Sequence, residues 1–377
     1  MKKSIYKMTA DEDRYLEFLR FAIDESKPQP AHIEQMNWQG LYDFAKRHAV
    51  LGVAYHGIQR MDAAAPRPET DLEFMFYGAA DRIRRKNIKL NMVAAKLSEN
   101  MLKEGFRSCI IKGQGNALMY PDPMMRQSGD IDIWLDGSRE DIFRMVKRDV
   151  PDADNQYHHI DYPIIKGVEI EIHYVPSFFS NLYYNRRLQK YFDSVSERQF
   201  CNWVELPDGL GTICRPTDDM NRIFQLSHVF KHFINGGVGL RQMIDYYYLL
   251  RRGISEEERK ECQRLLSRLN MLKFARGMMY VMQEALGLEK QFLITEPDEK
   301  LGEKLLFEVL TAGNFGRSDT RMKYKGKNKK VKLLWYSLRP WRYAREFPAE
   351  SLVRPLFLAW HQVWKWNEQR KYGKHPG

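Results

Sequence analysis

Apolar residues repeat at helical spacing in the first and last parts of the chain. Near the N-terminus the intervals are three and four residues, as in Trp38, Leu41, Tyr42 and Ala45. This spacing is typical of an amphipathic helix. Residues 74–103 are predicted to form one long helix that ends before Gly105. Helical spacing returns after Thr217, which is expected to cap the next helix with its side chain, and it continues to the end of the chain.

A different pattern separates these two helical regions. Short apolar runs predict strands at 108–112 and 131–135, and hairpins at 158–165 with 168–174 and at 203–206 with 211–214. Pro163 predicts that its strand lies at a sheet edge, because proline cannot donate a ladder hydrogen bond. The sequence therefore predicts an α+β fold with a small mixed sheet at its centre. The predicted regions are a helical region over 1–103, a mixed core over 104–216 and a helical region over 217–377.

Acidic residues lie at alternate positions on two of the predicted strands. Asp130 and Asp132 point to the same side of the first strand, roughly 7 Å apart along it. On a later strand, Glu169, Glu171 and His173 share one face. If the two strands are neighbours, Glu171 meets the aspartates, and the carboxylates would repel one another unless a metal neutralised them. Carboxylates suit hard divalent cations, and two Mg²⁺ ions about 3.5–4 Å apart would suit a triphosphate. Glu169 is expected to be a solvated neighbour.

The net charge of the chain indicates an anionic binding partner but does not identify which kind. The chain has 377 residues, of which 44% are apolar, and a net charge of +11. That excess of positive charge favours an anionic partner: nucleotide, nucleic acid or an acidic membrane surface. The four cysteines form no CxxC pair, so neither a zinc site nor a disulfide framework is indicated. The sequence has no signal-peptide pattern and no apolar stretch long enough to span a membrane, and a cytoplasmic location is expected.

Together these motifs resemble the bacterial uncharacterised nucleotidyltransferase family, within the polymerase-β-like superfamily. In the mixed core the matching residues are Lys112-Gly113, Tyr120-Pro121, Pro123, Arg126, Gly129-Asp130-Ile131-Asp132 and Glu171-Ile172-His173. In the helical region they are Leu226-Ser227-His228, His232, Gly236-Gly237, Leu240-Arg241 and Asp245. The resemblance covers about residues 35–255.

The resemblance implies transfer of a nucleoside monophosphate from an NTP to an acceptor hydroxyl, with release of pyrophosphate. Asp130, Asp132 and Glu171 would be the catalytic residues and the ligands of Mg²⁺, with two ions expected and Mn²⁺ as an alternative. Glu171 would also serve as general base. The acceptor stays open among a small molecule, a sugar, RNA and a protein.

Nucleotide contacts are expected around the glycine turn. Gly113 would let backbone amides approach phosphate, and Lys112 and Arg126 are candidate phosphate contacts. The superfamily usually has serine or glycine as the second residue of this turn, whereas this chain has Gln114. Gln114 or backbone amides would have to replace the hydroxyl contact. His173 is expected to contact nucleotide or metal, or to serve as a structural histidine beside the carboxylates.

Two alternatives stay open. The first is a noncatalytic nucleotide- or RNA-binding protein on a degenerate nucleotidyltransferase scaffold. The second is a membrane-surface or partner-docking protein that acts through the C-terminal part of the chain. Residues 321–345 contain many basic and aromatic side chains and no acid, a combination that suits RNA, anionic lipid or a solvated loop. His228 and His232 lie one helical turn apart, and packing or substrate contact is favoured over zinc binding there.

Overall fold

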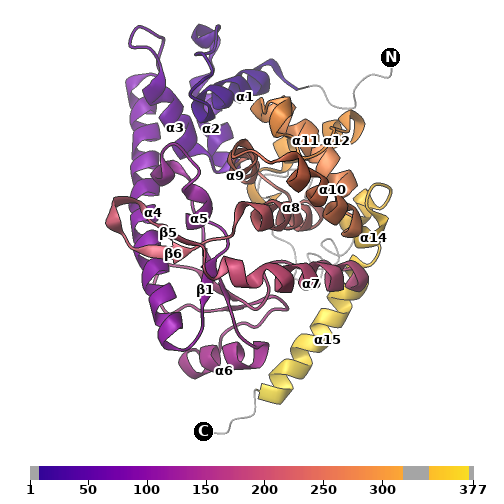
Figure 1. Ribbon diagram of the computed structural model, residues 1–377. Coiled ribbons are helices and arrows are strands. Elements are labelled where there is room, and N and C mark those ends of the chain that lie inside the picture. The colour runs from indigo at the N-terminus through magenta and orange to yellow at the C-terminus, as the bar shows by residue number, and fades with distance from the viewer. Residues whose placement is uncertain (1–7, 317–338, 373–377) are drawn as a thin grey trace.

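Four helices form the N-terminal part of the structure, a computed structural model that describes residues 8–316 and 339–372 (Figure 1). They are α1 (Ala10–Ile23), α2 (Trp38–His48), α3 (Leu51–Arg60) and α4 (Thr70–Lys103). The side chain of Thr9 caps α1 by accepting a hydrogen bond from the backbone amide of Glu12. The predicted long helix is confirmed as α4, which begins four residues earlier than expected.

The central sheet has four strands in the order β1-β2-β4-β3. They are β1 (Ser108–Ile110), β2 (Ile131–Leu135), β3 (His159–Asp161) and β4 (Ile170–His173). β2 and β4 are parallel, and the other two pairs are antiparallel. The mixed α+β fold is therefore confirmed. β3 lies at an edge of the sheet, as the presence of Pro163 predicted. The strand itself ends at Asp161, two residues before the proline.

The two faces of this sheet differ in polarity. Ile131, Ile133, Ile170 and Ile172 belong to an apolar core shared with α4 and with α6 (Arg139–Asp149). The alternate positions of the same strands, Asp132, Glu171 and His173, point to the other side because successive strand residues alternate. The apolar face thus anchors the sheet on two helices, and the polar face is left to form a site.

Helices dominate the rest of the chain. They are α5 (Gln114–Ala117), α7 (Leu182–Gln199), α8 (Asp218–Asn235), α9 (Leu240–Arg251), α10 (Glu256–Arg268), α11 (Leu272–Leu286), α12 (Glu299–Ala312), α14 (Pro348–Ser351) and α15 (Arg354–Tyr372). The second predicted hairpin is present as β5 (Trp203–Glu205) and β6 (Thr212–Cys214). Thr217 precedes α8 as predicted, but its hydroxyl donates to Gln199 Oε1 at 3.1 Å instead of capping the helix.

The C-terminal helix lies against the edge of the core that contains β3. Phe357 stacks on Phe178 with ring centroids 5.3 Å apart, and Trp360 contacts Tyr157 edge-on. These ring contacts dock the helix on the body of the protein. Of the basic aromatic segment 321–345, residues 321–338 lie outside the described residues, and Tyr343 is buried in the main core.

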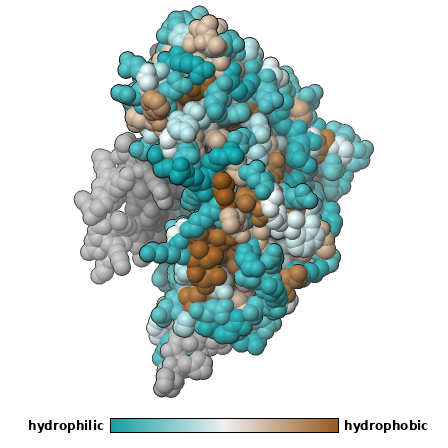
Figure 2. All heavy atoms as spheres, turned by 90° about the vertical axis from the view of Figure 1, so that its left-hand side faces the viewer, coloured by the Kyte–Doolittle hydropathy of each residue, from teal (hydrophilic) through white to brown (hydrophobic). Residues whose placement is uncertain are grey.

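The surface adds two observations. Figure 2 shows the side on which α4 lies, where a patch of apolar side chains interrupts a mostly hydrophilic surface. Exposed apolar residues of α4 include Phe74, Tyr77 and Met92. Within the described residues, no helix is both long enough and apolar enough to cross a membrane.

Candidate active site

A tight turn connects β1 to the short helix α5. Gly113 occupies this turn with φ +62°, a left-handed conformation that favours glycine, and it lies at the N-cap of α5. A Cβ at this position would lie 3.4 Å from the backbone oxygen of Asp130. The turn therefore places Lys112 and Gly113 directly beside the carboxylate strand. Gln114, the residue that departs from the family pattern, is buried with 2% exposure.

The register of the sheet brings the three predicted carboxylates together. Asp132 and Glu171 are direct partners in the parallel pair of β2 and β4. Asp130 precedes β2 on the same side as Asp132. One oxygen from each of these three carboxylates lies within 4.8 Å of the others. The convergence that the sequence predicted from two separate strands is present.

Cations hold these carboxylates in their charged form. Lys112 Nζ lies 2.7 Å from Asp132 Oδ1, and His173 Nε2 lies 3.0 Å from the same oxygen. Burial alone would raise the pKa of Asp132, but the charge of Lys112 and the hydrogen bond from His173 outweigh burial and lower it. Burial also opposes ionisation of Glu171, yet the hydrogen bond from His173 and nearby positive charges lower its pKa to about 2. Both carboxylates are ionised at neutral pH.

The donor set fits a hard divalent cation. All three side chains offer carboxylate oxygens, which Mg²⁺ and Mn²⁺ prefer. In addition, the second oxygen of Asp132 is buried and has no hydrogen-bond partner among the described residues. A buried anionic oxygen without a partner is costly unless a ligand satisfies it.

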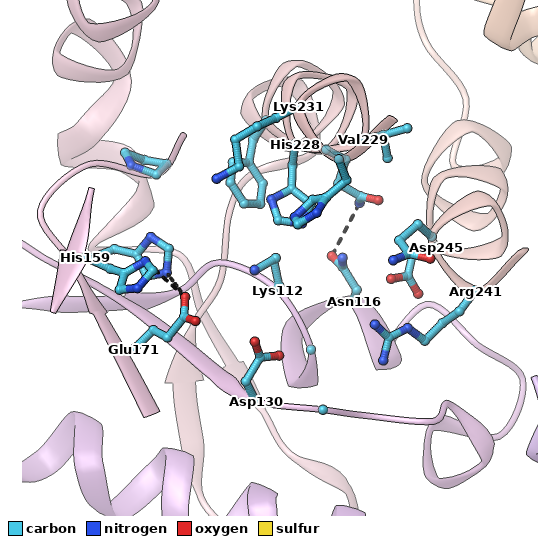
Figure 3. Close-up of a pocket in the computed structure, with 18 of the residues that line it drawn as sticks. Lys112, Asn116, Asp130, His159, Glu171, His228, Val229, Lys231, Arg241 and Asp245 are labelled. Atoms are coloured by element: carbon cyan, nitrogen blue, oxygen red, sulfur yellow. Dashed lines mark hydrogen bonds and ion pairs between the residues drawn. The ribbon is translucent and has the colours of Figure 1, made fainter. Parts of the chain in front are cut away.

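Two of the three carboxylates, Asp130 and Glu171, face a cavity of about 340 Å³ between the sheet and the helices α8 and α9 (Figure 3). Asp130 and Glu171 lie on the sheet side. The opposite side carries the amine of Lys231 and the guanidinium of Arg241, together with the imidazole rings of His228 and His232. Burial and the charge of Lys112 lower the pKa of Lys231 to about 7. The cavity therefore combines a carboxylate floor with a basic roof, as a metal-bound polyphosphate would require.

The two histidines of α8 do not form a metal cluster. Their ring centroids lie 4.3 Å apart, and burial lowers the pKa of both rings well below the usual value. Among the described residues, neither belongs to a group of three side chains able to hold an ion. Both rings line the cavity, and their contact with a substrate stays a prediction.

Arg126, a predicted phosphate contact, lines the cavity but is engaged elsewhere. Its Nε and one terminal nitrogen donate to the two oxygens of Asp245 at 2.8 and 2.6 Å. Tyr120 donates to the same carboxylate at 2.7 Å. Asp245 is thus a buried polar anchor in α9. Arg126 serves first to fix the loop before Asp130, and its contact with phosphate stays a prediction.

Two histidines at this site were not predicted from the sequence. His158 and His159 line the cavity from β3 and the residue before it. His159 is the cross-strand partner of His173. The signal was present in the sequence, because a hairpin between 158–165 and 168–174 places these histidines opposite the strand that carries Glu171 and His173.

The structure thus brings together a glycine turn, a pair of carboxylates at the start of β2 and a third carboxylate on the parallel strand β4, a grouping that suits divalent ions beside a polyphosphate. A family profile described as "Uncharacterised nucleotidyltransferase" matches residues 34–287, and the chain belongs to this family. Both observations support a general role in nucleotidyl transfer.

Structural comparison gives a distant likeness. The chain is similar to an antigenic nucleotidyltransferase-like protein from Paracoccidioides brasiliensis, with 13% sequence identity and a TM-score of 0.34. The match covers 53% of this chain and 93% of that protein. A search of curated proteins found no match.

Proposed function

We propose that this protein transfers a nucleoside monophosphate from an NTP to an acceptor hydroxyl. The observation that carries this proposal is the convergence of Asp130, Asp132 and Glu171, of which Asp130 and Glu171 line a cavity that Lys231 and Arg241 face from the other side. The acceptor oxygen would form a bond to the α-phosphorus, and the bond from that phosphorus to the bridging oxygen of pyrophosphate would break. Pyrophosphate would leave with the electron pair, and the hydroxyl would lose its proton.

Divalent ions would be held by Asp130, Asp132 and Glu171. When bound, such ions supply positive charge to the triphosphate and lower the pKa of the attacking hydroxyl. The pKa of Glu171, about 2, favours a role as a constantly ionised ligand. A carboxylate with so low a pKa is a weak base, so its role as proton acceptor would depend on the acceptor hydroxyl already being acidified.

The chain's own cations would bind the phosphates. Lys112 lies between the carboxylates and the cavity, and Lys231 and Arg241 face it from the helices (Figure 3). The turn at Gly113 would bring backbone amides close to a phosphate oxygen. This arrangement would hold the triphosphate between the glycine turn and the roof, with its α-phosphate toward the carboxylates.

Labelling experiments test the proposal directly. The full-length protein is incubated with each labelled NTP, Mg²⁺ and a cell extract, and the species that becomes labelled is identified. A labelled product together with released pyrophosphate is expected. Nucleotide binding without any Mg²⁺- or Mn²⁺-dependent turnover would favour the noncatalytic alternative.

Replacing Glu171 by glutamine should lower kcat much more than it changes the affinity for NTP. The amide keeps the shape of the side chain but removes a negative charge that would act on the reacting centre. Steady-state kinetics and equilibrium nucleotide binding separate the two effects. Glu169→Gln is the matched control, because Glu169 is exposed two residues earlier. An E171Q enzyme with unchanged kcat and weaker nucleotide binding would contradict the proposed role.

Nucleotide affinity should fall as pH rises above about 7, by at most about tenfold per pH unit. Lys231 would lose its proton in this range, because burial lowers its pKa to about 7, and a neutral amine attracts phosphate less. The charged and titratable groups around it are Lys112, Asp132, His158, Glu171 and Arg354.

Nucleotide dissociation constants measured across this pH range check the expectation. Lys231→Arg should flatten the profile, because guanidinium stays charged. Lys300→Arg, at an exposed position of α12, should keep the wild-type profile. An identical pH dependence in K231R and the wild type would assign the titration to another group.

A further inference from the structure

A second group of potential metal ligands lies beside the carboxylate trio. It consists of His159, Glu171 and His173, and one ligand atom from each lies within 4.8 Å of the others. The register of the sheet explains this grouping. His159 and His173 are directly opposed in the antiparallel pair of β3 and β4, and Glu171 points to the same side as His173.

The distances within this group suit a transition ion. His159 Nδ1 lies 3.2 Å from Glu171 Oε2, and His173 Nε2 lies 3.3 Å from the same oxygen. Ligands about 2.0–2.1 Å from a tetrahedral ion are separated by roughly 3.3–3.4 Å. Charge-assisted hydrogen bonds are shorter, at about 2.7–2.9 Å. Both nitrogens therefore lie at a ligand-to-ligand distance from Glu171 Oε2. A bound ion would take the place of the proton that His173 Nε2 shares with Asp132 and Glu171.

The surroundings also resemble those of a histidine metal site. His159 Nε2 lies 3.5 Å from Asp161 Oδ1, and Asp161 is the cross-strand partner of Glu171. A carboxylate behind a ligating histidine orients the ring and increases its basicity. His158 Nε2 lies 3.1 Å from His159 Nδ1, so a further imidazole nitrogen borders the same space.

The two ligand groups differ in chemistry. The first offers oxygen only, which suits Mg²⁺, whereas the second offers two imidazole nitrogens and one carboxylate, a set that favours Zn²⁺ and related transition ions. We propose that His159, Glu171 and His173 form a separate binding site for a divalent transition ion of the Zn²⁺ class. The site shares Glu171 with the proposed transferase centre but does not depend on nucleotidyl transfer.

Calorimetric titration of the chelator-treated, full-length protein with Zn²⁺, in saturating Mg²⁺ and without nucleotide, tests this site. One Zn²⁺ per chain is expected to bind. His159→Gln should weaken binding by at least about 100-fold, and Asp161→Asn by about 10- to 100-fold. Co²⁺ should give visible absorption bands of a low-coordinate ion in the wild type, and these bands should be lost in H159Q.

Two control variants establish whether Zn²⁺ binds at this group of ligands and not elsewhere on the chain. His32→Gln removes a histidine whose side chain is 71% exposed and should bind Zn²⁺ as the wild type does. Asp130→Asn removes a ligand of the oxygen group only and should also retain Zn²⁺ binding. Circular dichroism shows whether each variant is folded. If H159Q does not fold, D161N provides the test of the site.

The absence of Zn²⁺ binding in the wild type, or equal affinity in the wild type and a folded H159Q, would overturn the proposal. Because no NTP is present, these results do not depend on the transferase reaction. Zn²⁺ binding without any NTP turnover would support this site and contradict the proposed function. NTP turnover without Zn²⁺ binding would support the proposed function and contradict this site.

Discussion

Replacing Asp130 by asparagine should reduce Mg²⁺-dependent NTP turnover by at least about 10³-fold. The loss corresponds to about 4 kcal/mol of transition-state stabilisation, the scale expected when a catalytic metal site loses a charged ligand. Asp130 lies at the floor of the cavity, and one of its oxygens is within 4.8 Å of oxygens of Asp132 and Glu171. Asparagine has nearly the same shape, so the backbone before β2 should keep its course. Initial rates of pyrophosphate release across a range of Mg²⁺ concentrations measure the expected loss of turnover.

Asp152→Asn provides the matched control, because Asp152 is exposed in a loop outside the site. It should keep wild-type turnover. Asp132→Asn should also abolish turnover, but it would in addition leave Lys112 without the negative charge that lies 2.7 Å from its ammonium group. D130N therefore separates catalysis from stability more cleanly. A folded D130N protein with full activity would contradict the metal-site assignment.

Replacing Asp245 by leucine should destabilise the fold by about 3–5 kcal/mol, because the change leaves a buried guanidinium without its counter-charge. Arg126 and Asp245 are each only 4% exposed, and two hydrogen bonds join them. Loss of the carboxylate would also remove the acceptor for the Tyr120 hydroxyl. Urea denaturation followed by circular dichroism gives the change in the free energy of unfolding.

The double variant Arg126→Met with Asp245→Leu should recover much of this loss, because apolar replacement of both partners removes the unpaired charge. The exposed pair Arg264–Glu261 is the comparison. Glu261→Gln should cost no more than about 1 kcal/mol, since surface ion pairs contribute little. If D245L and E261Q lowered the free energy of unfolding by similar amounts, the buried pair would contribute no more to stability than a surface ion pair.

The strands and the carboxylate trio could be predicted because their signals are local. Ile131, Ile133 and Leu135 alternate with Asp132, so the strand and its buried face follow from a period of two residues. The same alternation placed Glu171 opposite the apolar face of its own strand. Only the pairing of the two strands had to be assumed, and a small sheet offers few choices.

Features that depend on contacts between distant segments were harder to predict. Arg126 and Asp245 are 119 residues apart, and neither side chain signals its partner locally. Arg126 was therefore interpreted as a phosphate contact on charge alone. The capping role expected of Thr217 was wrong for a similar reason, because Gln199 from the preceding helix supplies a competing acceptor for its hydroxyl. The basic roof likewise depends on how α8 and α9 pack over the sheet.

The bond between Arg126 and Asp245 also makes the two halves of the site inseparable. It fastens helix α9 to the loop that leads into Asp130, and α9 also supplies Arg241 to the cavity. A fragment that ends at residue 216 would keep Asp130, Asp132 and Glu171. It would lose Asp245, whose bond to Arg126 holds the loop before Asp130 in place. An engineered transfer of this site to another protein would therefore have to include helices α8 and α9 as well as the sheet.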